Sequence, residues 1–315
     1  MRERLAHAIL IQSGEGWGEL EFALSVAQSL LCEKPLADRR ACGVCPACNW
    51  FSQGNHPDFR LVVPESLAPE PQDEGAEPGK KRSEQIRIEQ VRDLADFLSV
   101  GTHRAGLRVI LIYPAEAMNA HTQNALLKSL EEPPPATVFL LVSTQADRLL
   151  ATVRSRCLRF TMAPPQSEEA LRWLTERGVA NPERALAAVG GAPLAALKAS
   201  DTETVRLAFI AGIRRPQFDP IALAETVERV PLWDLVAWLQ RWVFDLLLAR
   251  ATGRVRYHPD DEALIAETAR RCEPASIAAY LRGLAQARAL AKHPLNAKLF
   301  VEELLLQYRR LVGQP

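Results

Sequence analysis

The chain has 315 residues, of which 48% are hydrophobic and 24% are charged, and its 38 basic side chains balance 38 acidic ones. At about 150 residues per domain, this length predicts two domains or three small ones. The composition is that of a globular protein and excludes the disordered and fibrous classes. The zero net charge argues against a protein whose whole face is wrapped by nucleic acid, because such domains carry a basic excess.

No signal for membrane insertion or export is present in the sequence. No uninterrupted apolar run reaches 18 residues, so we expect no membrane span. The first ten residues, MRERLAHAIL, lead directly into the polar segment IQSGEG, and the apolar stretch is too short for the core of a signal peptide. We therefore expect a cytoplasmic protein, in which clustered cysteines favour metal binding over disulfides.

Short β-like runs alternate with helical patterns over the first half of the chain. This alternation predicts an α/β domain with a mostly parallel sheet. The expected strands are Ala8–Gln12, Arg60–Val63, Val109–Tyr113, Val138–Val142 and Cys157–Phe160. The expected helices are Leu20–Leu31, Ile86–Leu98 and Asn119–Glu132, and the last must stop where three prolines begin at Pro133.

Two changes of composition divide the chain. Residues 64–82 contain four prolines and five acidic residues and end in KKR, which predicts a flexible, solvated insertion, with a functional charged tail as the alternative. After Pro165 the β signals stop, and residues 166–200 form short helical pieces. We predict an α/β domain over residues 1–162, a small helical lid over 163–201 and a larger helical domain over 202–315.

The larger helical domain contains one clear amphipathic stripe. Its apolar residues recur at intervals of three and four, the spacing of one helix face. Such a stripe indicates packed core, and a surface for a partner is the alternative. The stripe consists of Leu232, Leu235, Leu239, Trp242 and Leu246.

The first expected strand leads into SGEGWGEL and then a helix, which is the context of a phosphate-binding loop of the pattern G-x-x-x-x-G-K-[ST]. With Gly18 as the second glycine and Gly16 within the loop, Ser13 takes the place of the first glycine. Glu19 then stands at the lysine position and Leu20 at the position of the metal-binding hydroxyl. A carboxylate repels a triphosphate, so the loop predicts no nucleotide turnover. An unrelated glycine turn is the alternative.

The acidic pair that accompanies a phosphate-binding loop is also incomplete. The strand Val109–Tyr113 is followed by Pro114 and Ala115 before Glu116, and the aspartate that usually ends such a strand is absent. A single acidic residue in this place is more typical of the surface than of a catalytic site. The two departures together predict an ATPase fold without ATPase activity.

Four of the six cysteines follow the spacing C-x9-C-x2-C-x2-C, within a module over residues 32–48. Thiolates two residues apart can hold one ion, and four of them complete the closed tetrahedron of structural zinc. Four free thiols or an iron–sulfur cluster are the alternatives. The predicted ligands are Cys32, Cys42, Cys45 and Cys48. His56 is expected to be a turn residue before Pro57, and Cys157 and Cys272 to be small buried residues.

Longer motifs carry a resemblance to a known family. A zinc module directly after the loop helix, NALLKSLEEPP (124–134) and LLATVRSRC (149–157) resemble bacterial clamp loaders of the AAA+ superfamily. The match extends from HAILIQ through HPDF (56–59) to PLNAKLFVEELLLQYRRL (294–311). The residues at 19 and 20 resemble the delta-prime branch of DNA polymerase III clamp loaders and not the ATP-hydrolysing gamma/tau subunits.

This resemblance implies a RecA-like sheet domain with a zinc module, a lid domain and a collar domain that joins a ring of five subunits. It also implies a non-hydrolysing stator that helps ATP-driven loading of the sliding clamp onto primed DNA during replication. The implied partners are gamma/tau, delta, the beta clamp and primed DNA, and the implied location is the nucleoid-associated replisome. Structural zinc is the implied cofactor, without ATP.

In the family, the arginine of the motif S-R-C reaches the γ-phosphate bound by a neighbouring subunit. The resemblance therefore implies that Arg156, beside Ser155, is an arginine finger that acts in trans, a task suited to a planar and permanently charged fork. A surface salt bridge is the alternative, as for Arg154 and Arg159. Thr144, at the place of a nucleotide-sensing residue, is then a structural remnant.

Two other functions compete with this interpretation. An active AAA+ ATPase with an unorthodox loop is disfavoured by Glu19, Leu20 and the missing aspartate. A zinc-dependent DNA-binding module is disfavoured by the zero net charge and by the absence of a basic cluster around the cysteines.

Overall fold

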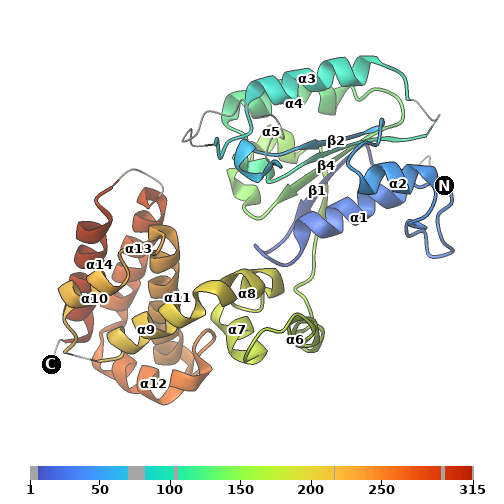
Figure 1. Cartoon of the computed structure of the whole chain (residues 1–315). Coiled ribbons are helices and arrows are strands. Elements are labelled where there is room, and N and C mark those ends of the chain that lie inside the picture. The colour runs from blue at the N-terminus through green and yellow to red at the C-terminus, as the bar shows by residue number, and fades with distance from the viewer. Residues whose placement is uncertain (1–5, 70–81, 103–105, 216, 292–294, 314–315) are drawn as a thin grey trace. The chain divides into compact units, whose positions relative to one another are not determined.

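The computed structural model describes residues 6–69, 82–102, 106–215, 217–291 and 295–313. The chain consists of two compact units, residues 1–164 and 165–315 (Figure 1). Among the described residues, the five-stranded sheet lies in the first unit and the second unit is helical. An α/β unit followed by helices confirms the predicted fold class.

All five strands of the sheet are parallel, in the order β2-β3-β4-β1-β5. The central strands β3 and β4 are buried along their whole length, as expected for strands covered on both faces. The registers pair Ala8 with Phe139 and Ile9 with Leu158. The strands are β1 (Ala8–Gln12), β2 (Phe59–Val62), β3 (Arg108–Ile112), β4 (Thr137–Ser143) and β5 (Leu158–Thr161).

Helices cover both faces of this sheet. Helix α1 packs through Ala23, Ala27 and Leu31 on one face, and a second cluster joins α3, α4 and α5 to the other. Figure 1 shows α3 and α4 on the side of the sheet opposite α1 and α2. The α-helices are α1 (Glu19–Leu31), α2 (Pro46–Ser52), α3 (Ile88–Ser99), α4 (Ala120–Glu131) and α5 (Ala151–Arg154), and the 3-10 helices are η2 (Glu65–Leu67), η3 (Ala115–Ala117) and η4 (Ala146–Arg148).

The five strands and three long helices predicted for this unit occur within two residues of their expected ends. The largest difference is at Ile86, which forms a bridge with Met118 before α3 begins at Ile88. Asn119 caps the start of α4, because its side chain accepts the Thr122 N–H at 2.9 Å. The short helix α2 was not predicted.

The predicted insertion is described only at its two ends, because residues 70–81 lie outside the described residues. At these ends, Arg82 donates to the carbonyl of Ala68 at 2.6 Å, and the Ser83 N–H donates to the Glu65 carboxylate at 3.1 Å. The two described ends of the insertion therefore lie beside each other. The flexibility predicted for the insertion stays a prediction.

The second unit has two hydrophobic clusters. Helices α6, α7 and α8 share a small core that includes Leu174 and Leu186, and the helices from α9 onward share a larger one. The predicted stripe on α11 belongs to the larger core. The helices are α6 (Ser167–Glu176), α7 (Pro182–Ala188), α8 (Pro193–Ala199), η5 (Ser200–Thr202), α9 (Glu203–Ile213), α10 (Pro220–Thr226), α11 (Leu232–Thr252), η6 (Pro259–Asp261), α12 (Glu262–Arg271), α13 (Pro274–Leu290) and α14 (Ala297–Val312).

None of the described helices is long and apolar enough to cross a membrane. The division of the chain at residues 162 and 201 into three functional domains stays a prediction.

Candidate functional site

The loop between β1 and α1 turns at two glycines with a left-handed backbone conformation. Gly16 and Gly18 have φ values of 77° and 94°, a region that glycine adopts without strain. Gly18 directly precedes α1. A Cβ atom at Gly14 would lie 2.3 Å from the indole of Trp17, so this ring packs directly against the loop backbone. A side chain of the loop therefore fills part of the space beside its own backbone.

Glu19 is the first residue of α1 and is only 4% exposed. One of its carboxylate oxygens accepts the Gly16 N–H at 3.4 Å and the Tyr113 hydroxyl at 3.1 Å. A negative charge at a helix N-terminus is favourable, as it is for a bound phosphate. The Gly16 N–H, a backbone donor of the kind that binds phosphate in such loops, thus already donates to the Glu19 carboxylate.

Tyr113 contacts this carboxylate, and Leu20 follows Glu19 on α1. Burial and the neighbouring Glu19 charge raise the pKa of the Tyr113 hydroxyl well above its usual value, so it is a hydrogen-bond donor at neutral pH. Leu20, at the position of the metal-binding hydroxyl, packs against the core on the α1 face of the sheet. Neither residue offers an ionised oxygen to a metal at neutral pH.

Glu116, for which the sequence favours a surface position over a catalytic one, is hydrogen bonded to Thr144. Its side chain is half-buried, and one carboxylate oxygen accepts both the backbone N–H and the hydroxyl of Thr144, at 3.0 and 2.8 Å. The two residues follow the neighbouring strands β3 and β4, whose carboxyl ends meet at one edge of the sheet. The carboxylate of Glu116 therefore anchors the turn after β4.

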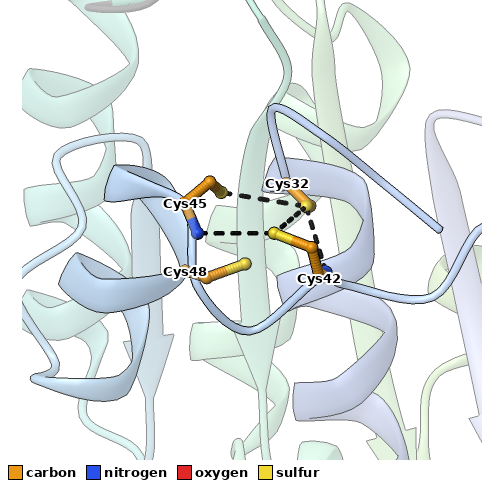
Figure 2. Close-up of side chains that lie close together, drawn as sticks. All are labelled: Cys32, Cys42, Cys45 and Cys48. Atoms are coloured by element: carbon orange, nitrogen blue, oxygen red, sulfur yellow. Dashed lines mark hydrogen bonds between the residues drawn. The ribbon is translucent and has the colours of Figure 1, made fainter.

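The four predicted cysteines lie together in the predicted zinc module, residues 32–48 (Figure 2). Cys32 ends α1, Cys45 caps α2, Cys48 lies on α2, and Cys42 lies on the loop between the two helices. All four Sγ atoms are within 4.8 Å of one another, and the Sγ of Cys32 is 3.6 Å from that of Cys42 and 3.9 Å from that of Cys45.

These sulfur spacings fit a tetrahedral zinc ion. Zinc–sulfur bonds of about 2.3 Å place the sulfurs of a regular tetrahedron about 3.8 Å apart. Backbone N–H groups of Val44 and Cys45 lower the pKa of Cys42. Burial opposes ionisation of Cys45, but hydrogen bonds outweigh it and lower its pKa to about 6. Four thiol donors with stabilised thiolates among them can hold a metal ion without leaving a position open for catalysis.

The remaining thiols and His56 have the structural roles expected from the sequence. Cys157 and Cys272 are buried, and burial raises the pKa of both, to about 11 for Cys157. His56 is 3% exposed, and its Nδ1 accepts the Asp58 N–H at 3.1 Å within the turn before β2.

Arg156 lies in the turn between α5 and β5, with its guanidinium held within its own unit. It donates to the carbonyl of Thr152 at 2.8 Å and to the hydroxyl of Ser155 at 3.4 Å, and it forms an ion pair with Glu131 at 2.5 Å. Arg154, two residues earlier, pairs with Asp147 at 3.1 Å. Arg159 is exposed on the edge strand β5.

Arg156 and the loop lie at opposite edges of the parallel sheet. Arg156 precedes β5, whereas the loop follows β1, and β5 pairs with β1 from Ile9 to Gln12. At about 3.3 Å per residue, the strands separate these two edges by more than 10 Å. The structure therefore brings Glu19 to Tyr113 and Glu116 to Thr144, but it does not bring Arg156 to the loop of its own chain. The contacts of Trp17, Tyr113 and Glu131 had no signal in the sequence.

These features define a protein with a parallel α/β unit, in which the glycine loop after the first strand donates to a carboxylate of its own chain, and with four cysteines that could hold a metal ion. Residues 1–166 match the family described as DNA polymerase III, delta subunit, and residues 203–310 match the family described as its C-terminal region. DNA polymerase III subunit delta' of Pseudomonas aeruginosa is 35% identical over 99% of this chain and 94% of its own length.

The corresponding subunit of Escherichia coli is 28% identical over 96% of this chain and 88% of its own length. The tau subunit of Escherichia coli is 31% identical, but over only 58% of this chain and 26% of its own length. The chain belongs to the family of DNA polymerase III delta-prime subunits.

Proposed function

We propose that this chain is the non-hydrolysing stator of a DNA polymerase III clamp loader, which helps a neighbouring ATPase subunit to load the sliding clamp onto primed DNA. The observation that carries this proposal is the position of Glu19, whose buried carboxylate accepts a loop N–H. Leu20 supplies no oxygen for magnesium, so the loop lacks both the cation and the metal ligand that ATP requires.

Arg156 and Ser155 supply the chemical contribution of the chain in this proposal. Arg156 lies at the sheet edge opposite the loop of its own chain, which supports a role at a nucleotide bound by another subunit. A guanidinium can stabilise the charge that develops on the transferred phosphoryl group without taking part in a covalent step. The relatives named as tau subunits indicate the kind of neighbour that would bind this nucleotide.

The zinc module supports the fold in this proposal. Cys32, Cys42, Cys45 and Cys48 would hold one zinc ion and connect α1 to α2, and a closed set of four thiolates has no role in the reaction. The remaining partners are the delta subunit, the beta clamp and primed DNA, and the place of action is the replisome on the nucleoid in the cytoplasm.

The proposal is tested with the isolated chain and with the reconstituted complex. Calorimetric titration of the isolated chain with Mg-ATP should give no heat of binding at concentrations that saturate an ordinary P-loop. A complex assembled from the clamp-loader subunits of the same organism should lose clamp loading when this chain is omitted. Micromolar ATP binding that depends on residues 14–20 would favour an active ATPase, and undiminished loading without the chain would overturn the stator role.

A further inference from the structure

The guanidinium of Arg156 is held at the surface of its unit by identifiable groups. Nη1 contacts the carbonyl of Thr152 and the hydroxyl of Ser155, and Nη2 contacts the carboxylate of Glu131. A guanidinium has five N–H donors, and these contacts engage at most three of them. The Arg156 side chain is 34% exposed, so N–H groups outside these contacts are available to an anion from another molecule.

The position of Glu131 is set by the end of α4 and by its packing on α5. Helix α4 ends at Glu131 because prolines follow from Pro133. The Gln123 side chain accepts the Leu150 N–H at 2.7 Å, which fixes the start of α5 against α4. Glu131 lies eight residues after Gln123, about 12 Å further along α4, and the packing of α4 on α5 brings it beside Arg156.

We infer that Glu131 is a positioning residue for Arg156, an inference that rests on the arginine finger proposed above. The carboxylate holds one part of the guanidinium and leaves the rest of its N–H donors directed at the phosphate of a neighbouring subunit. A long side chain loses rotamer freedom when it binds, and a guanidinium that is already oriented loses less. Glu131 acts through Arg156 and does not itself contact the nucleotide.

The neighbouring pair of Arg154 and Asp147 provides a matched control. Both arginines lie within the same short segment, and each contacts an exposed carboxylate at a distance typical of an ion pair. Only the pair that includes Glu131 orients the proposed finger. Removing either carboxylate should leave the fold intact, because exposed ion pairs contribute little to stability.

The test uses the reconstituted clamp loader with its sliding clamp and primed DNA. Steady-state ATP hydrolysis is measured for the wild type, Glu131→Gln, Arg156→Ala, the double variant and Asp147→Asn. We expect Glu131→Gln to lower kcat about fivefold with the KM for ATP within about twofold, and Asp147→Asn to change kcat less than about twofold. In the Arg156→Ala background, Glu131→Gln should have no further effect, because its action passes through Arg156.

Three results would overturn the inference: an unchanged or raised kcat for Glu131→Gln, an equal loss for Asp147→Asn, or a full further loss from Glu131→Gln in the Arg156→Ala background. Melting of the isolated variants and gel filtration of each complex check folding and assembly. If Arg156→Ala itself leaves hydrolysis unchanged, the arginine finger is wrong and the positioning role is wrong with it. If Arg156→Ala lowers hydrolysis and Glu131→Gln does not, only the positioning role is wrong.

Discussion

A single residue, Glu19, carries the proposal that the loop after β1 does not bind a nucleotide. In a phosphate-binding loop a lysine at this position attracts the nucleotide, whereas here a buried carboxylate accepts hydrogen bonds from Gly16 and Tyr113. The sequence predicts repulsion of the triphosphate by this charge. The structure adds a steric reason, because the Glu19 side chain and the Trp17 indole occupy space beside the loop backbone.

Removing only the charge should therefore not restore nucleotide binding. In Glu19→Gln the side chain keeps its size and can still accept both hydrogen bonds. We therefore expect calorimetry to detect no Mg-ATP binding with a Kd below about 1 mM, which corresponds to a binding free energy of about −4 kcal/mol. Trp17→Ala serves as the companion variant that opens the loop without changing its charge. Micromolar affinity of Glu19→Gln would show that repulsion alone excludes ATP.

The second prediction at the residue scale concerns Arg156. Because the arginine lies away from the loop of its own chain, its loss should be detected only in the assembled complex. We expect Arg156→Ala to lower DNA-stimulated ATP hydrolysis and clamp loading, the latter by about tenfold, since charge stabilisation in a closed site can contribute several kcal/mol. Arg156→Lys should restore little, because an ammonium lacks the planar fork.

Arg154→Ala and Arg159→Ala are the controls for this measurement and should reduce loading less. Assembly of each complex is followed by gel filtration. Normal clamp loading by a fully assembled Arg156→Ala complex would exclude the arginine finger and leave the stator role to stand without it.

At the scale of elements, the zinc module joins the end of α1 to the start of α2. The positive φ of Gly43, 75°, allows the tight turn between Cys42 and Cys45, and the Cys45 N–H donates to the sulfur of Cys42 at 3.4 Å. A short segment with little apolar core needs such a crosslink to hold its shape. In the proposal, a bound zinc ion therefore supports the segment that follows the loop helix.

We expect one zinc ion per purified chain by elemental analysis. Cys45→Ser should lose most of this metal and lower the melting temperature of the first unit, since structural zinc contributes to folding. Cys272→Ser, a buried thiol outside the module, should retain one equivalent. Iron in place of zinc, or a metal content unchanged in Cys45→Ser, would contradict the assignment.

In the second unit, a buried carboxylate and a buried histidine lie together. The carboxylate of Asp245, fully buried on α11, accepts the backbone N–H groups of Arg256, Tyr257 and His258 and contacts the His258 ring at 3.0 Å. Burial lowers the pKa of His258 from its usual 6.5, and the Asp245 carboxylate only partly opposes this effect. Two arginines near the ring, Arg206 and Arg241, lower the pKa further.

The stability that His258 contributes should be lost at acidic pH. The ring binds a proton less readily in the folded chain than in the unfolded chain, so its contribution is complete above pH 6.5 and declines as the pH falls below that value. We expect the thermal midpoint of the second unit, measured by calorimetry between pH 7.5 and pH 5, to decline less steeply in His258→Gln than in the wild type. Parallel profiles for the two proteins would show that His258 does not contribute.

At the scale of the whole molecule, the chain combines a unit that carries every candidate site with a helical unit that carries none of them. Its acidic and basic side chains cancel, so a long-range electrostatic attraction to DNA is not expected of the chain as a whole. The proposed function therefore depends on assembly with other subunits.

The proposed assembly predicts which proteins co-purify with this chain from its native cells. A tagged version of the full chain should co-purify with subunits of the tau and delta kind, and the recovery should persist after nuclease treatment, because it depends on protein contacts. Recovery of the chain alone, or of partners only in the presence of DNA, would contradict membership of a preformed clamp loader.

The sequence by itself determined the order of strands and helices in the first unit, because apolar periodicity and prolines act locally. It also identified the four cysteines, whose close spacing along the chain already limits how far apart they can lie. Glu19 and Leu20, which stand in place of the lysine and the hydroxyl of the phosphate-binding pattern, predict the absence of phosphate-binding chemistry, and this stays a prediction.

Only the tertiary structure decided which distant residues meet. Tyr113 reaches Glu19, Thr144 anchors Glu116, and Glu131 contacts Arg156 because strands and helices far apart in sequence pack side by side. These contacts join pairs separated by 25 or more positions, and no local pattern records such a pairing. The placement of Arg156 away from its own loop follows in the same way from the parallel direction of β1 and β5, which chain order alone does not fix.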